Sequence, residues 1–353
     1  MSKEGIYGKT ARYDRDFLVS TENKKYKVTH LGDLCYNPAN LKFGVICLNT
    51  YGDAIFSPIY VTFEIEASFD PDFIGAYLTR WDFINRALKY QQGTVYERMA
   101  VSPEDFVSIK CCFPQKAEQT RLAEFITLLD KRIAAQGKYV ESLKKYKRGV
   151  VRTLLSPKHC SIKNVKWTTS RIGDIGIFIK GAPLSKADIS LEGTPFILYG
   201  ELYTTYSEVI SNVVRKTQAS VDKQYYSQIG DVIIPTSGET PEEISTASCV
   251  MLPDIILAGD LNIYRCTQVD GRIMSYILNH VVNDRIARIA QGKSIVHVQA
   301  AEISKIEITY PDPFSQKTII AILAAISDRI DQSNAELRLL NELRKALLQK
   351  LFI

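Results

Sequence analysis

The chain repeats one long stretch of sequence about 197 residues further on, and this repeat decides the fold. Residues 119–155 read QTRLAEFITLLDKRIAAQGKYVESLKKYKRGVVRTLL, and residues 316–352 read QKTIIAILAAISDRIDQSNAELRLLNELRKALLQKLF. The two stretches align without a gap. A long element that recurs after each of two globular segments suits a chain built to hold two similar modules. The repeat therefore indicates a bipartite recognition protein before it indicates an enzyme.

Both stretches are predicted to form long helices, because their apolar residues recur at alternating spacings of four and three. No proline interrupts either stretch, and Pro114 and Pro313 stand just ahead of them, where helices tolerate proline. An apolar stripe of this length must be buried, and the stripe of the other copy matches it, so we expect an antiparallel helix pair. The stripe residues predicted to pack are Leu122, Ile126, Leu129, Ile133, Ile319, Leu323, Ile326 and Ile330.

Each apolar stripe is interrupted once, and at the same place in both copies. Gln136 and Ser333 occupy equivalent positions between apolar neighbours. Polar residues that face each other inside a helix pair can fix its register at some cost in stability. The alternative is local fraying of the helix beside Gly137, with both polar residues in solvent.

The globular segments repeat as well, since residues 28–114 align with residues 226–311. LGDL at residues 31–34 matches IGDV at residues 229–232, and RALKYQQG at residues 86–93 matches RIARIAQG at residues 285–292. Each module has strand-like runs, such as LNIYRC from Leu261, followed by one amphipathic helix. That helix is expected from Ile74 to Leu88 in the first module and from Ile273 to Ile289 in the second.

The predicted fold class is therefore α+β, with two similar domains of small mixed sheets and helices. We expect two long helices, packed as an antiparallel coiled-coil-like pair, to separate these domains. The predicted boundaries are a first module at residues 1–114, a central helix at 115–157, a second module at 158–312 and a C-terminal helix at 313–353. Residues 158 to about 200 have no counterpart ahead of the first module, which is therefore shortened at its amino-terminal side.

Composition and charge favour a soluble cytoplasmic protein with a polyanionic partner. The chain is 46% hydrophobic and 24% charged, has no apolar run of 18 residues and starts without an apolar signal region. Its seven cysteines contain no CxxC pair, so we expect reduced thiols and neither disulfides nor zinc. The net charge is +5, and residues 116–157 contain ten Lys or Arg against four Asp or Glu. Such a basic cluster suits DNA, although many charge runs are only solvated helix faces.

Several stretches that resemble enzyme motifs fail on inspection. AQGKS at residues 290–294 looks like the end of a phosphate-binding loop, but Ala287 stands where the first glycine of that loop belongs. YNPAN at residues 36–40 lacks the second proline and the aromatic residue of amino-methyltransferases. The four histidines show no spacing of metal ligands. We therefore predict no catalytic residue and no metal site on this chain.

A glycine recurs in the two modules, as Gly93 and Gly292, and the polar residues just before and after it are the best candidates for contact with DNA. Arginine, lysine and glutamine are side chains that read base edges or hold phosphates. The alternative is that Arg86 and Arg285 are structural ion-pair partners and that the glycine is only a helix cap. The candidate DNA-binding residues are Arg86, Lys89, Gln92 and Thr94 in the first module, and Arg285, Arg288, Gln291 and Lys293 in the second.

The sequence resembles the specificity (S) subunit of type I restriction-modification systems, over nearly the whole chain. The resemblance rests on PQKAEQTRLAEFITLLDKRI from Pro114 with LKKYKRGVVRTLLS from Leu143. The second copy is PDPFSQKTIIAILAAISDRI from Pro311 with LNELRKALLQKLF from Leu340. The opening of the second module, around Trp167, also looks like the start of a target recognition domain. Two positions of the second copy depart from the pattern, where Ser327 matches Asp130 and Ser315 matches Glu118.

The resemblance implies a non-catalytic, DNA-binding subunit with two target recognition domains, each reading one half of a gapped site in double-stranded DNA. The paired helices would set the gap and would bind two methyltransferase (M) subunits, which restriction (R) subunits then join. S-adenosylmethionine, ATP and Mg would belong to those partners, with no cofactor on this chain. Two alternatives stay open. In the first, the chain is a protein–protein scaffold. In the second, it is a truncated specificity subunit in which only one recognition domain works.

Overall fold

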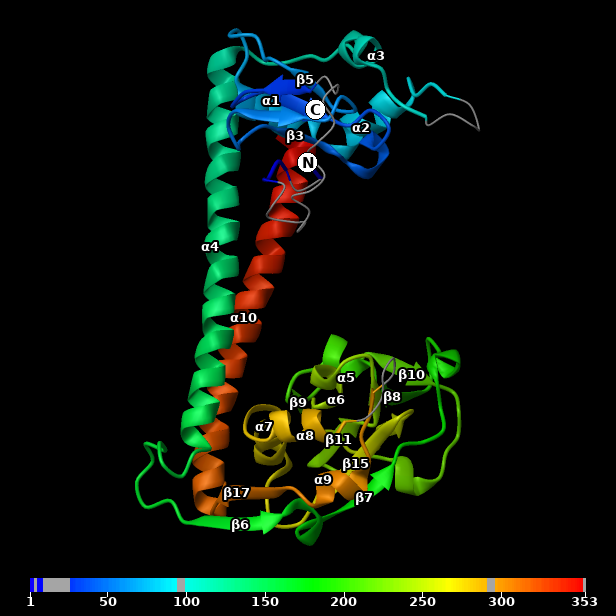
Figure 1. Cartoon of the computed structure of the whole chain (residues 1–353), viewed down its shortest axis with the longest axis vertical. Helices are drawn as coiled ribbons and strands as arrows, with labels where there is room; N and C mark the ends of the chain where they lie inside the picture. The colour runs from blue at the N-terminus through cyan, green and yellow to red at the C-terminus, as the bar shows by residue number, and fades with distance from the viewer. Residues whose placement is uncertain (3–4, 9–25, 94–98, 291–295, 352–353) are drawn as a thin grey trace. The chain divides into compact units, whose positions relative to one another are not determined.

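The computed structural model describes residues 1–2, 5–8, 26–93, 99–290 and 296–351 (Figure 1). The chain divides into two compact units. Unit 1 consists of Met1–Lys138 and Asn334–Ile353, and unit 2 consists of Tyr139–Ser333. Each unit contains part of both long helices, α4 (Lys116–Leu154) and α10 (Pro313–Leu351). Pro313 is the first residue of α10, a position where the missing N–H of proline costs nothing.

Unit 1 is built from short antiparallel strands covered by helices. One sheet has the order β3-β2-β5, and a second contains only β1 and β4. The strands are β1 (Lys27–Thr29), β2 (Leu34–Tyr36), β3 (Ile46–Leu48), β4 (Ala54–Phe56) and β5 (Val61–Phe63). The helices that follow them are α1 (Pro71–Leu78), α2 (Trp81–Leu88) and α3 (Pro103–Ser108).

Unit 2 contains a larger, mixed set of sheets. The main sheet has the order β7-β15-β11-β13-β9, and smaller sheets are β10-β8-β14, β12-β16 and β17-β6. The first strands are β6 (Trp167–Arg171), β7 (Gly176–Lys180), β8 (Thr194–Leu198), β9 (Val209–Ile210), β10 (Arg215–Thr217) and β11 (Asp231–Pro235). The later strands are β12 (Ser237–Gly238), β13 (Ser248–Val250), β14 (Ile256–Ala258), β15 (Leu261–Cys266), β16 (Val296–His297) and β17 (Glu307–Pro311). The helices are α5 (Glu201–Thr204), α6 (Pro241–Ile244), α7 (Gly271–His280), α8 (Asn283–Ile289) and α9 (Ala300–Ser304).

The two units share one module, and its strand register is the same in both. In unit 1, Leu34 of β2 pairs with Leu48 of β3 and with Phe63 of β5. In unit 2, Val232 of β11 pairs with Cys249 of β13 and with Tyr264 of β15. Three helices follow in the same order in each unit, α1, α2 and α3 in one and α7, α8 and α9 in the other. The repeated sequence therefore encodes a repeated fold, down to which residues face each other across the sheet.

The single amphipathic helix predicted for each module is wrong, because the structure has two helices in its place. In unit 1, α1 ends where the Thr79 hydroxyl donates to the Gly75 carbonyl at 2.8 Å, and Arg80 is extended before α2 begins. In unit 2, Val281 and Val282 separate α7 from α8. Apolar residues keep a helical spacing across both breaks, so the sequence pattern predicted one continuous helix in each module. Trp81 and Val281, which continue this apolar spacing, are nevertheless 56% and 44% exposed.

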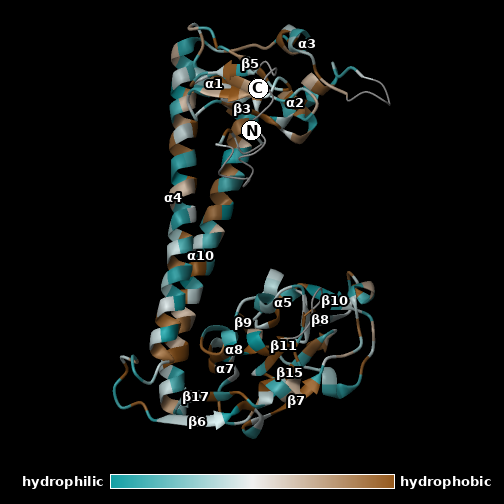
Figure 2. Ribbon diagram, viewed as in Figure 1, coloured by the Kyte–Doolittle hydropathy of each residue, from teal (hydrophilic) through white to brown (hydrophobic). Residues whose placement is uncertain are grey.

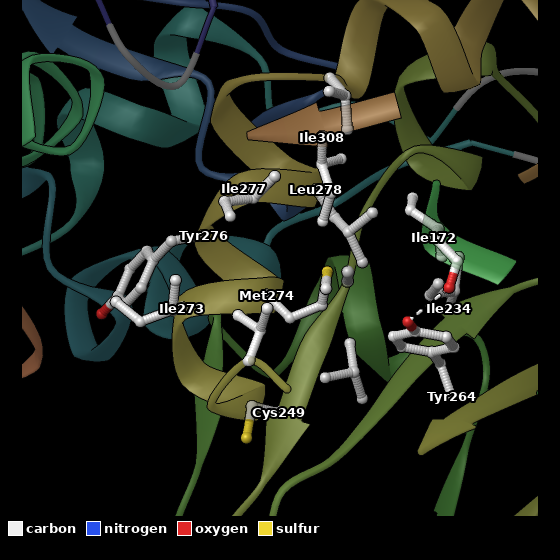
Figure 3. Close-up of a cluster of buried hydrophobic side chains, with 14 of the residues drawn as sticks. Ile172, Ile234, Cys249, Tyr264, Ile273, Met274, Tyr276, Ile277, Leu278 and Ile308 are labelled. Atoms are coloured by element: carbon white, nitrogen blue, oxygen red, sulfur yellow. Dashed lines mark hydrogen bonds between the residues drawn. The ribbon is translucent and has the colours of Figure 1, made fainter. Parts of the chain in front are cut away.

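The largest hydrophobic core lies in unit 2, where α7 packs on the main sheet (Figure 3). Met274, Ile277 and Leu278 of α7 are fully buried there, and each contributes about 1.5–3 kcal/mol by leaving water. The hydroxyl of the buried Tyr264 donates to the Ile172 carbonyl at 2.8 Å, so the polar end of this ring is satisfied within the core. The run from Leu261 to Cys266 is β15, as the sequence predicted.

The two long helices pack against each other in antiparallel orientation within each unit. In unit 1, Asp130 and Arg132 in the first half of α4 form ion pairs with Arg344 and Glu336 in the second half of α10. In unit 2, the Arg329 guanidinium of α10 donates to the Tyr139 hydroxyl of α4 at 3.3 Å. Hydrophobic and hydrophilic residues alternate along both helices (Figure 2). The predicted fold class, α+β with an antiparallel pair of long helices, is confirmed.

No helix in the described part of the chain is long and apolar enough to cross a membrane. All seven cysteines lie in the described part of the chain, and none is paired there.

Candidate nucleic-acid interface

The arginine that stands shortly before Gly93 or Gly292 is bonded, in each unit, to the segment that leads into a long helix. In unit 1, the Arg86 guanidinium donates to the Cys111 sulfur at 3.3 Å and lies over the Phe83 ring. In unit 2, the Arg285 guanidinium donates to the Glu307 carbonyl at 3.0 Å. Cys111 and Glu307 both lie in the segment that leads into a long helix. Both arginines therefore have bonds within their own unit, although neither bond is the ion pair that the alternative expected.

Lys89 and Arg288 differ from these arginines, since both side chains are exposed and form no ion pair or side-chain hydrogen bond with another described residue. Lys89 caps the carboxyl end of α2, and Arg288 is in the last turn of α8. Gln92 is also exposed, and its amide donates to the Asp105 carboxylate at 3.0 Å. Thr94, Gln291 and Lys293 lie outside the described residues. Among the sequence candidates, Lys89 and Arg288 are the cations that the structure leaves most available to a phosphate.

The basic run near the end of α4 is split between solvent and the interior of unit 2. Lys144, Lys145, Arg148 and Arg152 are exposed. Lys147 is not, because its ammonium donates to the Glu208 carboxylate at 2.8 Å and only 11% of its side chain is exposed. The exposed cations lie on one helix and give this part of unit 2 a positive surface, which favours a polyanion.

Glu208, Lys147 and His280 form a buried polar cluster that the sequence analysis missed. Glu208 accepts from Lys147 and also from His280 Nε2, each at 2.8 Å. Burial opposes ionisation of Glu208, but the hydrogen bond from His280 and the charge of Lys147 outweigh it and lower the Glu208 pKa to about 2. Lys147 also lies over the Tyr276 ring, with 5.3 Å between the ammonium and the ring centroid. The cluster fixes α4 to α7 in unit 2.

A buried glutamine at the start of each long helix joins that helix to its own module. In unit 1, Gln119 Oε1 accepts from the Asp70 N–H at 3.0 Å, and its amide donates to the Pro114 carbonyl at 2.8 Å. In unit 2, Gln316 makes the same two bonds, to the Asp270 N–H and the Pro311 carbonyl, both at 2.8 Å. Both glutamines are 2–3% exposed. Their recurrence 197 residues apart was visible in the sequence, but only the structure shows why glutamine is needed.

The eight residues predicted to pack along the helix pair are all buried or half-buried. Ile319 and Leu323 are fully buried in the core of unit 2, and Ile126 is 7% exposed in the core of unit 1. Gln136 is also buried, and its amide donates to the Glu336 carboxylate at 3.1 Å. Ser333 is 3% exposed. The predicted alternative, in which both polar residues fray into solvent, is wrong.

No group of three or more His, Cys, Asp or Glu side chains in the described part of the chain is arranged to hold a metal ion.

Residues 164–342, just over half of the chain, match the family described as type I restriction modification DNA specificity domain. The chain belongs to this family. The resemblance noted in the sequence is thereby confirmed, and the protein is a specificity subunit, the DNA-recognition component of such a system. A search of curated proteins finds no match.

Two solved structures have the same fold as this specificity subunit. One comes from work on complex assembly and conformational transition of the type I R-M system; it is 18% identical, with 95% of this chain and 84% of that chain covered and a TM-score of 0.61. The other is the type I restriction-modification S subunit from M. genitalium, which is 16% identical, with 95% and 87% covered and a TM-score of 0.57.

Proposed function

We propose that this specificity subunit reads a bipartite, gapped site in double-stranded DNA and serves as the scaffold for methyltransferase (M) and restriction (R) subunits. The observation that carries the proposal is the shared module, which has one strand register and one glutamine bridge in both units. Two copies of a reader in one chain suit two half-sites on one duplex. Neither copy needs high affinity alone, because their linkage raises the effective concentration of the second.

The exposed apolar side chains of the long helices are the docking positions that we propose for two M subunits. Phe125 in unit 1 is 48% exposed, and its counterpart Ile322 in unit 2 is 37% exposed. Leu343 in unit 1 and its counterpart Tyr146 in unit 2 are 49% and 61% exposed. Exposed apolar residues on a helix favour a protein partner. Equivalent residues in both units favour two copies of the same partner.

We further propose that the chain itself carries out no catalysis and that methyl transfer and cleavage belong to its partners. S-adenosylmethionine, ATP and Mg would then be bound by the M and R subunits. A cytoplasmic location follows from the proposed substrate, which is cellular DNA.

A second candidate is a specificity subunit in which only unit 2 reads DNA. In unit 2, β17 pairs with β6 over five residues. Residues 110–114, the counterpart of β17 in unit 1, have no strand partner among the described residues. Such a reader would specify one half-site, and methylation would then follow a short continuous motif without a second, distant half.

The helix pair is expected to act as the spacer between half-sites, so lengthening it should lengthen the gap. Four residues inserted after Gly137 and after Asn334, which are equivalent positions, add about 6 Å to each helix. That length corresponds to roughly two base pairs at 3.4 Å each. The measurement is methylation-site sequencing of DNA from cells that contain the protein and its M subunit. The unaltered protein should give a gapped motif, and the insertion variant the same two halves with a longer gap.

A continuous motif for the unaltered protein would favour the second candidate, and no sequence preference at all would favour a scaffold without DNA recognition. If the gap does not change on insertion, the spacer role of the helices is contradicted, but the reading of a bipartite site is not.

Changes at Arg285, Arg288 and Gln291 are expected to alter the reading of one half-site and to leave M-subunit binding intact. Replacing a phosphate contact such as Arg288 by alanine should weaken DNA binding and reduce its salt dependence, and losing a base contact should relax specificity at one position. Binding to labelled duplex at several salt concentrations measures the first effect, and methylation sequencing the second.

Changes at Arg86 and Lys89 provide the matched comparison, since they should affect only the other half-site. If the Arg285, Arg288 and Gln291 variants all methylate the original sites at the original rate, the assignment of this region to DNA is wrong.

A further inference from the structure

Unit 2 contains a cavity of about 860 Å³ with a buried, unpartnered amide among its lining residues. The cavity lies between the loop after β7, the start of β15 and the segment that leads from β16 into α9. Asn262 of β15 lines it and is only 2% exposed. Its Nδ2 is the one buried side-chain N or O atom in the described part of the chain that lacks a hydrogen-bond partner.

The strand that carries Asn262 is held in place on both sides, so among the described residues its amide cannot reach an acceptor by a shift of the backbone. Its backbone pairs with Lys180 of β7 on one side and Ile234 of β11 on the other, so β15 cannot shift. Its side chain is on the same sheet face as Tyr264, two residues further on. The Tyr264 hydroxyl has a partner, the Ile172 carbonyl, whereas Asn262 Nδ2 has none among the described residues. Buried N–H groups without a partner are rare and need an explanation.

Four of the other polar side chains that line the cavity can donate hydrogen bonds, namely those of Lys180, Thr236, His297 and Gln299. Lys180 and His297 are exposed there, together with the amide of Gln299. The one carboxylate, Asp260, already accepts from the Ser237 hydroxyl at 2.9 Å. A cavity with donors at its floor and its rim suits a ligand rich in acceptors. Nucleotides are such ligands, since purine N7, guanine O6, thymine O4 and phosphate oxygens all accept hydrogen bonds.

We propose that Asn262 is a DNA-contacting residue of unit 2, and that its free amide N–H donates to an acceptor atom of a nucleotide that enters this cavity. This inference rests on the proposed function and adds to it a residue that is not among the sequence candidates. The amide is partnerless in the free protein because its partner belongs to the DNA. Lys180 and His297 then meet the sugar-phosphate backbone at the rim of the cavity.

The test is a pair of substitutions in the full chain, measured together with its M subunit. In Asn262→Leu, the unsatisfied group is replaced by an apolar side chain of similar size, so the melting temperature should stay equal or rise. Affinity for duplex that carries the wild-type methylation motif should nevertheless fall about tenfold or more. In Asn262→Asp, the donor is lost and an acceptor added, so binding should fall at least as far. Asn341→Leu is the control, because Asn341 is exposed on α10 and bonds within its own helix.

The outcomes separate the possible partners of the amide. A methylation motif altered at one position in the Asn262 variants assigns the base edge, and weaker binding with an unchanged motif assigns the phosphate. Unchanged affinity and motif in a folded Asn262→Leu variant would overturn the inference and leave a structural water as the partner. If the unaltered protein itself directs no site-specific methylation, the proposed function fails first, and the two failures are therefore distinguishable.

Discussion

Replacing Glu208 by glutamine is expected to destabilise unit 2 by about 3 kcal/mol, the cost of leaving a buried cation without its counter-ion. Glu208 is the only carboxylate bonded to Lys147 and His280 in the described structure, and the side chains of all three are 11–16% exposed. Glutamine keeps the size of the side chain but removes the charge that balances Lys147. Urea unfolding at neutral pH, followed by circular dichroism, measures the loss.

The same cluster should make the stability of unit 2 sensitive to acid. The pKa of Glu208 is lowered from 4.5 to about 2 in the folded protein. A carboxyl group whose folded pKa is depressed contributes stability above its unfolded pKa, and that contribution disappears as pH falls from 4.5 towards 2. The Glu208→Gln variant lacks this group, so its stability should fall less over that interval. Lys147 adds no dependence there, because its raised pKa affects only alkaline pH.

A double variant distinguishes the ion pair from simple packing. In Lys147→Met combined with Glu208→Gln, no unbalanced charge remains, so the loss should be clearly smaller than in Glu208→Gln alone. If the free energy of unfolding of the double variant is instead clearly lower than that of Glu208→Gln alone, the electrostatic account of the cluster is wrong.

The long helices could be predicted from sequence because their signal is local and periodic. Apolar residues such as Leu122 and Ile126 recur every three or four positions with no proline between them. Few structures other than a helix place such residues on one face. The module helices were read less well, since apolar spacing runs on through Thr79 and Val281. α1 ends because the backbone of Arg80 is extended, which hydrophobic periodicity cannot register.

The polar groups of unit 2 could not be predicted, because their partners are distant in sequence. Glu208 meets Lys147 from 61 residues away and His280 from 72 residues away. Asn262 stands within the apolar run of β15, where nothing in the sequence shows that its amide lacks a partner. For the repeated arginines, the sequence did mark the positions, but it did not show their role. Their recurrence was correctly noticed, but Arg285 bonds to Glu307 in the fold, so recurrence alone did not separate a structural role from contact with DNA.

Replacing Gly271 by alanine is expected to cost about 4 kcal/mol or more, which is among the largest effects of a single substitution. A Cβ atom on Gly271 would lie 2.0 Å from the Gly230 carbonyl oxygen and 2.9 Å from the Cys249 sulfur. Neither side can give way easily. Gly230 has a φ of +96° and donates to the Val250 carbonyl at 2.8 Å, while the residue before Gly271 is bonded to Gln316. To relieve these contacts, the first turn of α7 would have to move away from Gly230 and from Cys249 of β13.

Gly200→Ala is the matched control, since a Cβ atom there meets only the Tyr203 ring end, at 3.5 Å, and the backbone φ of −67° suits alanine. It should leave stability within about 1 kcal/mol of the unaltered protein or raise it slightly. Thermal and urea unfolding of both variants test the prediction. A Gly271→Ala protein as stable as the control would mean that α7 does not approach the turn at Gly230 so closely. The bridge from Gln316 to the start of α7 would then need another geometry, and with it the attachment of α10 to the recognition module of unit 2.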